Sequence, residues 1–276
     1  MKGAELGRRV EPGAVRPDLG RLTAPDRPQA RVRWVPRQHG AWAMLAIPFV
    51  LGIVASRPSP WQAVLAVAAV AAYLASSALL DYARSRRRAY LEPAAVFGTC
   101  FAVAGLALLA VAPGLLLVAV IGALAAAVAL GVSIVGHPRS LVASLAQVAE
   151  ALLLVPAAAL VAGAFDPPTV ARAVLVAGGY LVSSVLVVRS MIRARGDRAF
   201  LALSAGYHAL AVVAAALLLP PAYAVLALAL AVRAVGLPLL QDRLADGPHR
   251  LRPVHLGIVE IAASLALVLA VVVARF

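Results

Sequence analysis

Charged, aromatic and sulfur-containing side chains are scarce in this chain of 276 residues. Only 13% of the residues are charged and 5% are aromatic, and the sequence has one cysteine and a single lysine, Lys2. Because Cys100 is alone and lies in an apolar stretch, an internal disulfide and a cysteine-based metal site are excluded. The sequence also lacks a Gly-x-Ser-x-Gly motif and a glycine-rich phosphate loop, so it has no signature of a serine hydrolase or of a phosphate-loop protein.

Hydrophobic residues make up 63% of the chain, with alanine, valine and leucine dominant. A soluble domain is nearer to about half apolar, with about a quarter of its residues charged, so the excess here must face lipid. The strands of a membrane barrel would show segments of roughly ten residues with every second position polar. No such alternation is visible. The composition therefore predicts an all-α, polytopic membrane helix bundle.

The chain divides into a basic tail and a membrane part near Pro36. Residues 1–35 carry arginines and prolines with almost nothing to bury, which predicts a disordered cytoplasmic tail. The tail has no apolar run of the kind that marks a signal peptide. We therefore expect residues 36–276 to form a transmembrane helical domain whose first helix is also the first insertion signal.

About nine apolar segments follow the tail, each close to the roughly 20 residues that cross the hydrocarbon of a bilayer. Pro48, Pro156 and Pro238 fall inside these segments or near their ends and predict kinks, which membrane bundles tolerate. The segments run approximately over residues 41–56, 61–80, 93–112, 114–136, 140–164, 169–192, 199–219, 221–241 and 254–275.

The basic residues follow the topology of these segments. The chain has 25 Lys+Arg against 12 Asp+Glu, a net charge of +13, and arginines gather in alternate connections. Short connections rich in arginine stay in the cytoplasm. The pattern predicts a cytoplasmic amino terminus and an outer carboxyl terminus, and it explains the net charge without a nucleic-acid partner. The arginine-rich connections are the tail, residues 84–88, Arg139, residues 193–198 and residues 243–252.

Ionisable side chains within the segments form a second pattern. Such groups are costly in a membrane, and each is by default a candidate functional residue. The deepest, Glu150, lies ~15 Å from the cytoplasmic start of its segment at about 1.5 Å per residue, and the outer half has no comparable group. Together with polar residues at the cytoplasmic surface, the predicted binding residues are Gln38, His39, Asp81, Glu150, Arg189, His208, Arg233, His255 and Glu260.

This one-sided set predicts a water-filled chamber that opens to the cytoplasm. Within it we expect Glu150 and Glu260 to pair with Arg233 and Arg189, because an unpaired buried charge is far costlier than a paired one. The alternative is that the charges are structural pairs that hold the helices together. The neutral candidates to line the chamber are Gln38, Gln147, Ser183, Ser184, Ser204 and Tyr207.

The same side chains include residue types that bind metals, but their spacing argues against a metal site. His255 and Glu260 are five residues apart, which is a poor separation for ligands on one helical face. We therefore expect no metal and no cofactor, and the sequence identifies no catalytic residue.

Three stretches of the membrane part resemble the YwiC-like family of bacterial multi-pass membrane proteins. The first is Pro36–Met44, which reads PRQHGAWAM and is followed by Pro48 and Gly52. The others are Arg86–Tyr90 (RRRAY) and Arg252–Glu260 (RPVHLGIVE). The resemblance implies an uncharacterised multi-pass protein of the bacterial inner membrane.

The expected topology is also similar to that of UbiA-type prenyltransferases, in which two aspartate-rich motifs hold magnesium and an isoprenoid diphosphate. At the equivalent places this chain has Leu80–Arg86 (LDYARSR) and Arg193–Arg198 (RARGDR). Each has one acid where the family has several. Two lone carboxylates are too few to hold magnesium on a diphosphate in the usual way.

These observations leave three hypotheses for the function. The leading one is a protein that binds or transports an anionic or amphiphilic small molecule through the chamber, with histidines that carry protons near neutral pH. The second is a divergent UbiA-like lipid-modifying transferase, and the third is an assembly factor for another membrane complex. In each case we expect the lipid bilayer as a partner and no nucleic acid.

Overall fold

The computed structural model describes residues 34–36, 39–137, 140–244, 253–274 and 276, and of His39 and Pro253 it describes only the backbone. The predicted basic tail, apart from Trp34 and Val35, lies outside the described residues. Within them, every regular element is helical, as predicted. The elements are α1 (His39–Val54), α2 (Pro60–Ser85), a short 3-10 turn (Arg88–Tyr90), α3 (Leu91–Val111), α4 (Leu115–Ile134), α5 (Leu141–Leu152), α6 (Leu154–Val161), α7 (Pro167–Ile192), α8 (Arg198–Leu218), α9 (Pro221–Arg243) and α10 (Pro253–Ala274).

Several helices begin at capping residues that can be recognised in the sequence. Asp197 accepts a hydrogen bond from the backbone N–H of Phe200 at the start of α8. Asp166 caps α7 in the same way, and hydrogen bonds from the side chain and then the backbone of Thr169 hold the pKa of the Asp166 carboxyl below its usual value. Such caps satisfy backbone N–H groups that have no partner within the helix.

Residues at the start of α2 and just before it also form hydrogen bonds with α6 and the residue that follows it. Ser59 caps α2, and the buried side chain of Gln62 closes the capping box by accepting from the Ser59 backbone N–H. The Gln62 amide then donates to the carbonyl of Ala158, 3.2 Å away in α6. Arg57 donates from Nε to the carbonyl of Ala162 at 3.0 Å. These bonds satisfy the carbonyl groups at the end of α6 and fix it beside the α1–α2 connection.

The helices account for all nine predicted membrane segments. Eight segments of the described chain are long and apolar enough to cross a membrane, with α5 and α6 counted as the single segment Leu141–Val161. The remaining one, α1, has 16 residues. At about 1.5 Å per residue it covers ~24 Å, which is less than the ~30 Å of a typical hydrocarbon core.

Proline interrupts one of these segments. Helix α5 ends at Leu152 and α6 begins at Leu154, two residues before Pro156. A proline ring clashes with the carbonyl four residues earlier and cannot donate to it, which frees the carbonyl of Leu152. The interruption between α5 and α6 lies where a kink was predicted at Pro156. Helices α1 and α9, in contrast, continue through Pro48 and Pro238 as single helices.

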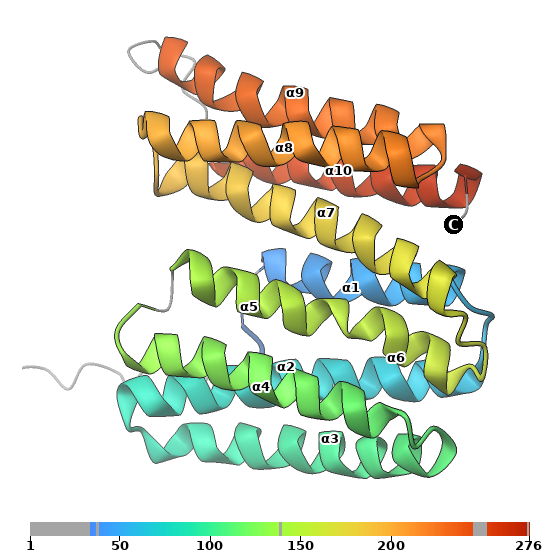
Figure 1. Ribbon diagram of the computed structural model, residues 1–276. Coiled ribbons are helices and arrows are strands. Elements are labelled where there is room, and N and C mark those ends of the chain that lie inside the picture. Colours follow the sequence, from blue (N-terminus) through green and yellow to red (C-terminus); the bar gives the residue numbers. More distant parts are fainter. Residues whose placement is uncertain (1–33, 37–38, 138–139, 245–252, 275) are drawn as a thin grey trace, which may run out of the picture. The chain divides into compact units, whose positions relative to one another are not determined.

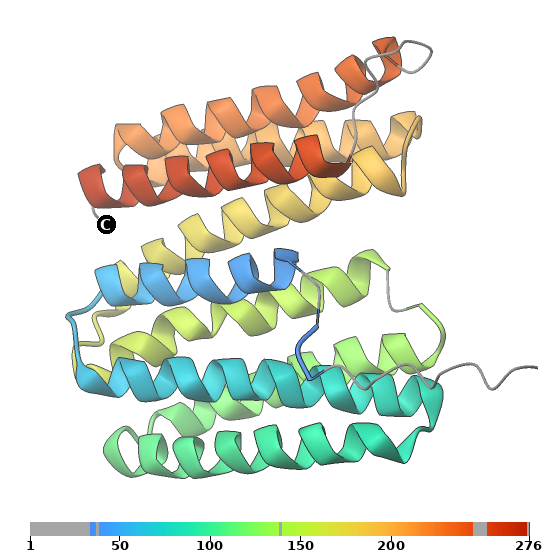
Figure 2. The ribbon, with the colours of Figure 1, turned by 180° about the vertical axis from the view of Figure 1, so that it is seen from behind.

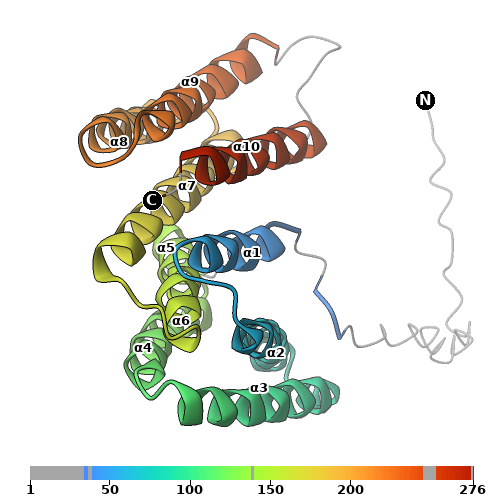
Figure 3. The same cartoon turned by 90° about the vertical axis from the view of Figure 1, so that its right-hand side faces the viewer.

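Helix α7 joins two groups of helices within residues 34–276. It packs against α1, α5 and α6 on one side and against α8, α9 and α10 on the other (Figures 1 and 2). The end-on view places α7 between these groups (Figure 3). Half of its most hydropathic stretch is buried, against 6% for α4. The buried polar residues of α7, Tyr180, Ser183 and Ser190, therefore lie in the interior, whereas Arg172 near its start is exposed.

The outer helices expose large apolar side chains, as a lipid environment requires. Examples from α4 are Leu116, Leu117 and Leu124, which are 61%, 67% and 65% exposed. Exposed apolar surface on this scale is not tolerated by a water-soluble monomer. The protein is therefore a multi-pass helix bundle suited to a bilayer.

The direction of the helices brings arginine-rich connections to the same end. The α2–α3 and α7–α8 connections, with Arg84–Arg88 and Arg193–Arg198, both lie at the left of Figure 1. The connections of α1 to α2, α3 to α4, α6 to α7 and α8 to α9 lie at the right. This arrangement agrees with the predicted alternation, whereas the assignment of the left end to the cytoplasm stays a prediction.

Candidate functional site

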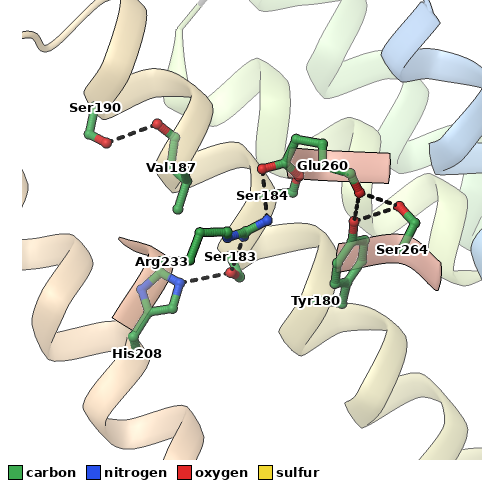
Figure 4. A network of polar contacts seen from close by, with 9 residues as sticks. All are labelled: Tyr180, Ser183, Ser184, Val187, Ser190, His208, Arg233, Glu260 and Ser264. Carbon is green, nitrogen blue, oxygen red and sulfur yellow. Dashed lines mark hydrogen bonds and ion pairs between the residues drawn. The ribbon is translucent and has the colours of Figure 1, made fainter. Parts of the chain in front are cut away.

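An ion pair between Arg233 of α9 and Glu260 of α10 is the centre of a polar network in the bundle interior (Figure 4). Nη1 of Arg233 donates to Oε1 of Glu260 at 2.7 Å. The second carboxylate oxygen accepts from the hydroxyl of Ser184 in α7 at 2.5 Å. The arginine side chain is 8% exposed and the glutamate side chain 18%. The pair is therefore largely removed from solvent and lipid, with the glutamate on its more open side.

A second branch runs from the same arginine to α8. Nη2 of Arg233 donates to Oγ of Ser183 at 2.9 Å, and this hydroxyl is 2.7 Å from Nε2 of His208. The other ring nitrogen, Nδ1, lies 2.7 Å from the carbonyl of Ser204. A carbonyl can only accept, so Nδ1 carries the hydrogen, and in the neutral ring Nε2 accepts from Ser183. The donors then run in one direction from Arg233 through Ser183 to His208.

A third branch joins α7 to α10 through hydroxyl groups. Tyr180 Oη lies 2.7 Å from Oγ of Ser264 and 3.2 Å from the backbone carbonyl of Glu260. Ser264 donates to the same carbonyl at 2.8 Å. These bonds hold the turn of α10 that carries the glutamate. Neither Tyr180 nor Ser264 was predicted, although Ser264 is four residues after Glu260 and so on the same helical face.

The α7 part of the network follows from helical spacing. Tyr180, Ser183 and Ser184 are separated by three and four residues, which places them on one side of a helix. Tyr180 is 3% exposed and Ser183 is 1% exposed. A hydroxyl can satisfy its hydrogen bonds inside a bundle with one or two neighbours, so this face can be buried where charged residues from α9 and α10 meet it.

Two buried polar atoms of the network have no partner among the described residues. They are Oγ of Ser204 and Nε of Arg233. Ser204 is fully buried. A buried polar atom without a partner is costly, so these atoms mark where the network has capacity for a further donor or acceptor.

Three of the predicted binding residues, His208, Arg233 and Glu260, come together in this network. The other described ones do not. Asp81 is exposed near the end of α2, and His255 is exposed in the first turn of α10. Arg189 is half-buried near the end of α7, with its guanidinium 5.7 Å from the ring centre of Phe200. Gln38 and the side chain of His39 lie outside the described residues. The binding roles of all nine stay predictions.

The expected pairing of Glu150 with an arginine is wrong. Glu150 is exposed on α5 and forms no hydrogen bond or ion pair with any residue that the structure describes. Helix α5 packs against α1, α4, α6 and α7 rather than against α9, which carries Arg233. The depth of a carboxylate along the membrane normal therefore did not predict which carboxylate pairs with Arg233.

The network contains few metal-ligating side chains. Within the part of the chain that the structure describes, no group of three or more His, Cys, Asp or Glu side chains comes together. Of the two acids at the places of the prenyltransferase motifs, Asp197 is engaged as the cap of α8 and Asp81 is exposed. The transferase hypothesis stays a prediction.

A groove of about 490 Å³ lies beside the connection between α1 and α2. It includes no residue of the polar network, so it is not the predicted chamber, which also stays a prediction. The groove is lined by Phe49, Ile53, Pro58, Ser59, Pro60, Gln62, Ala63 and Ala66.

Comparison with known proteins gives a match that covers less than half of the chain. Residues 35–159 match the model of the YwiC-like protein family. Over 41 residues the chain is 51% identical to the uncharacterized protein YwiC of Bacillus subtilis (strain 168), a stretch that covers 15% of this chain and 17% of that relative. No solved structure matches. The matched region ends in α6, before the helices of the polar network.

Proposed function

We propose that the protein, whose residues 35–159 match the model of the YwiC-like family, is a multi-pass protein of the bacterial inner membrane that binds an anionic or amphiphilic small molecule. The binding site is the polar network of α7 to α10, and the bound molecule is transported across the membrane or released on the cytoplasmic side. Arg233 is the anion-binding group, Ser184 is the neutral donor beside it, and Ser183 holds the guanidinium in place.

The observation that carries this proposal is the Arg233–Glu260 ion pair within the membrane bundle. Charged side chains inside membrane segments are costly and are concentrated where ligands or ions are handled. Nη1 of Arg233 and the hydroxyl of Ser184 already hold the Glu260 carboxylate, so an anion that replaced it would meet two donors directed at a carboxylate. The apolar helices around these groups suit the hydrocarbon part of an amphiphile.

Accessibility supports the same site. Glu260 keeps 18% of its side-chain surface exposed, more than twice the exposed fraction of Arg233. A ligand that approached from the glutamate side would reach the guanidinium by replacing the glutamate. The unpartnered Nε of Arg233 adds a donor that a ligand oxygen can use.

Mass spectrometry of the protein purified in a mild detergent tests this proposal. We expect a defined anion or amphiphile with the wild type and with the control Arg172→Gln, which changes an exposed arginine of α7. The amount bound should fall at least tenfold in Arg233→Gln. Because this variant leaves Glu260 unpaired, the double variant Arg233→Gln/Glu260→Gln is measured beside it and should also lose the ligand. Full retention by a monodisperse double variant would disprove the assignment.

The extent of pairing in the network favours a second candidate, an assembly factor without a ligand. Nearly all polar atoms of the network bond one another, which is what a purely structural role requires. This candidate predicts that no small molecule is retained by any variant and that a specific membrane protein is retained instead. The same purification therefore separates the two functions.

A further inference from the structure

We propose that the ligand is a monocarboxylate that replaces the carboxylate of Glu260 on Arg233, and that one proton binds to Glu260 for each ligand bound. This inference rests on the proposed function, since it assigns the chemical class of the ligand and the coupling ion to the same site. The Glu260 carboxylate stands in for the ligand when the site is empty.

The arrangement of donors argues for a carboxylate. The two oxygens of Glu260 are held separately, Oε1 by Nη1 of Arg233 and Oε2 by the hydroxyl of Ser184. One guanidinium N–H and one hydroxyl thus supply a donor for each oxygen of a carboxylate, and the bond to the guanidinium is charge-assisted. Glu260 is the more exposed partner, and its carboxylate can swing away on its side-chain torsions while Arg233 stays bonded to Ser183. A ligand carboxylate can then take both vacated donors.

The charge of the site argues for the proton. Arg233 is the cation of the network, and in the empty site it is neutralised by Glu260. A bound carboxylate together with ionised Glu260 would leave one uncompensated negative charge in the bundle, which the interior disfavours. A proton transferred from hydronium or a buffer acid in the solvent to the displaced Glu260 carboxylate restores neutrality. The bond between the proton and its solvent donor breaks as one O–H bond forms on Glu260. Anion and proton then bind together without net charge.

The other groups around Glu260 do not supply this proton. From α7 the titratable group is Tyr180, whose hydroxyl is bonded to Ser264 and to the carbonyl of Glu260. From α8 the nearest is His208, which is separated from Glu260 by Ser183 and Arg233, with both ring nitrogens engaged. Helix α1 also packs against α10, and its only ionisable residue is His39, whose side chain lies outside the described residues.

Calorimetric titration of the protein in lipid nanodiscs with acetate, butyrate and octanoate tests the inference. Two buffers of different ionisation enthalpy report the protons taken up. We expect at least one of the three to bind the wild type with uptake of about one proton, and its Kd to rise about tenfold from pH 7 to pH 8. In Glu260→Gln, which resembles the protonated residue, Kd should be independent of pH and lower than that of the wild type at pH 8.

The double variant Arg233→Gln/Glu260→Gln has no unpaired charge and should bind none of the three, and Arg172→Gln should behave as the wild type. Binding of inorganic phosphate but no carboxylate would overturn the carboxylate inference and leave anion binding at the site intact. Carboxylate binding that is independent of pH in the wild type would overturn the proton coupling alone. If neither carboxylate nor phosphate binds and purification retains no small molecule, the proposed function itself fails.

Discussion

At the scale of single residues, removal of one partner of the Arg233–Glu260 ion pair affects stability differently from replacement of both partners. Arg233 and Glu260 are 8% and 18% exposed, so their attraction is weakly screened but each has lost much of its hydration. Deletion of one partner leaves a buried, uncompensated charge. Replacement of both by apolar residues removes the desolvation cost together with the attraction.

We therefore predict that Glu260→Ala lowers the free energy of unfolding by about 3 kcal/mol, in the range for a broken buried pair. The double variant Arg233→Leu/Glu260→Leu should lie within about 1 kcal/mol of the wild type, because it leaves no unpaired charge. Unfolding in mixed micelles, followed by circular dichroism, measures both. A single variant as stable as the wild type would show that Arg233 finds another partner.

At the scale of elements, α1 crosses α6 at close range. Gly52 of α1 lies against α6, where an added Cβ would be 2.8 Å from Cβ of Ala158 and 2.9 Å from the backbone carbonyl of Val155. Backbone atoms cannot move aside as a flexible side chain can, so α1 and α6 would have to separate. Small residues at such crossings let membrane helices pack at close range.

Gly52→Ala should therefore lower the free energy of unfolding by about 1–3 kcal/mol, the usual cost of overpacking. The matched control is Gly105→Ala in α3, where an added Cβ meets nothing within 4 Å. This control should match or slightly exceed the stability of the wild type, because alanine favours a helix over glycine by about 1 kcal/mol. Equal stability of the two variants would mean that α1 and α6 are less closely packed than described.

At the scale of the whole molecule, the arrangement of helix ends leaves two possible membrane orientations, which differ in the end of the bundle that faces the cytoplasm. The connections with Arg84–Arg88 and Arg193–Arg198 share one end of the bundle, and the α1–α2 and α6–α7 connections share the other (Figure 1). Because arginine-rich connections stay in the cytoplasm, we predict that the end with these two connections is the cytoplasmic one.

Cysteine labelling of intact cells tests the orientation, and the single cysteine of the chain makes it practical. In a Cys100→Ser background, Phe165→Cys in the α6–α7 connection should react with a membrane-impermeant maleimide. Gly196→Cys in the α7–α8 connection should react only after the cells are permeabilised. The reverse pattern would invert the topology, and with it the side from which Glu260 is reached.

The sequence alone determined the fold class, the membrane segments and the helix starts at residues such as Ser59, Asp166 and Asp197. These features depend on the length of apolar runs and on contacts between residues close in the chain, so local rules predict them. The sequence also identified His208, Arg233 and Glu260 as ionisable residues inside the bundle, but it placed Glu150 there too, and Glu150 is exposed on α5. It could not assign their partners, because two carboxylates at similar depth look alike along the chain.

Only the tertiary structure decided that Glu260 rather than Glu150 meets Arg233, because α9 packs against α10 and not against α5. The same packing brought in Tyr180 and Ser264, whose hydroxyls are unremarkable within their own helices. Which helices are neighbours depends on contacts between residues far apart in sequence, including the close approach at Gly52. Ion-pair partners in a membrane bundle depend on which helices are neighbours. The periodicity of a single helix does not show which helices pack against it.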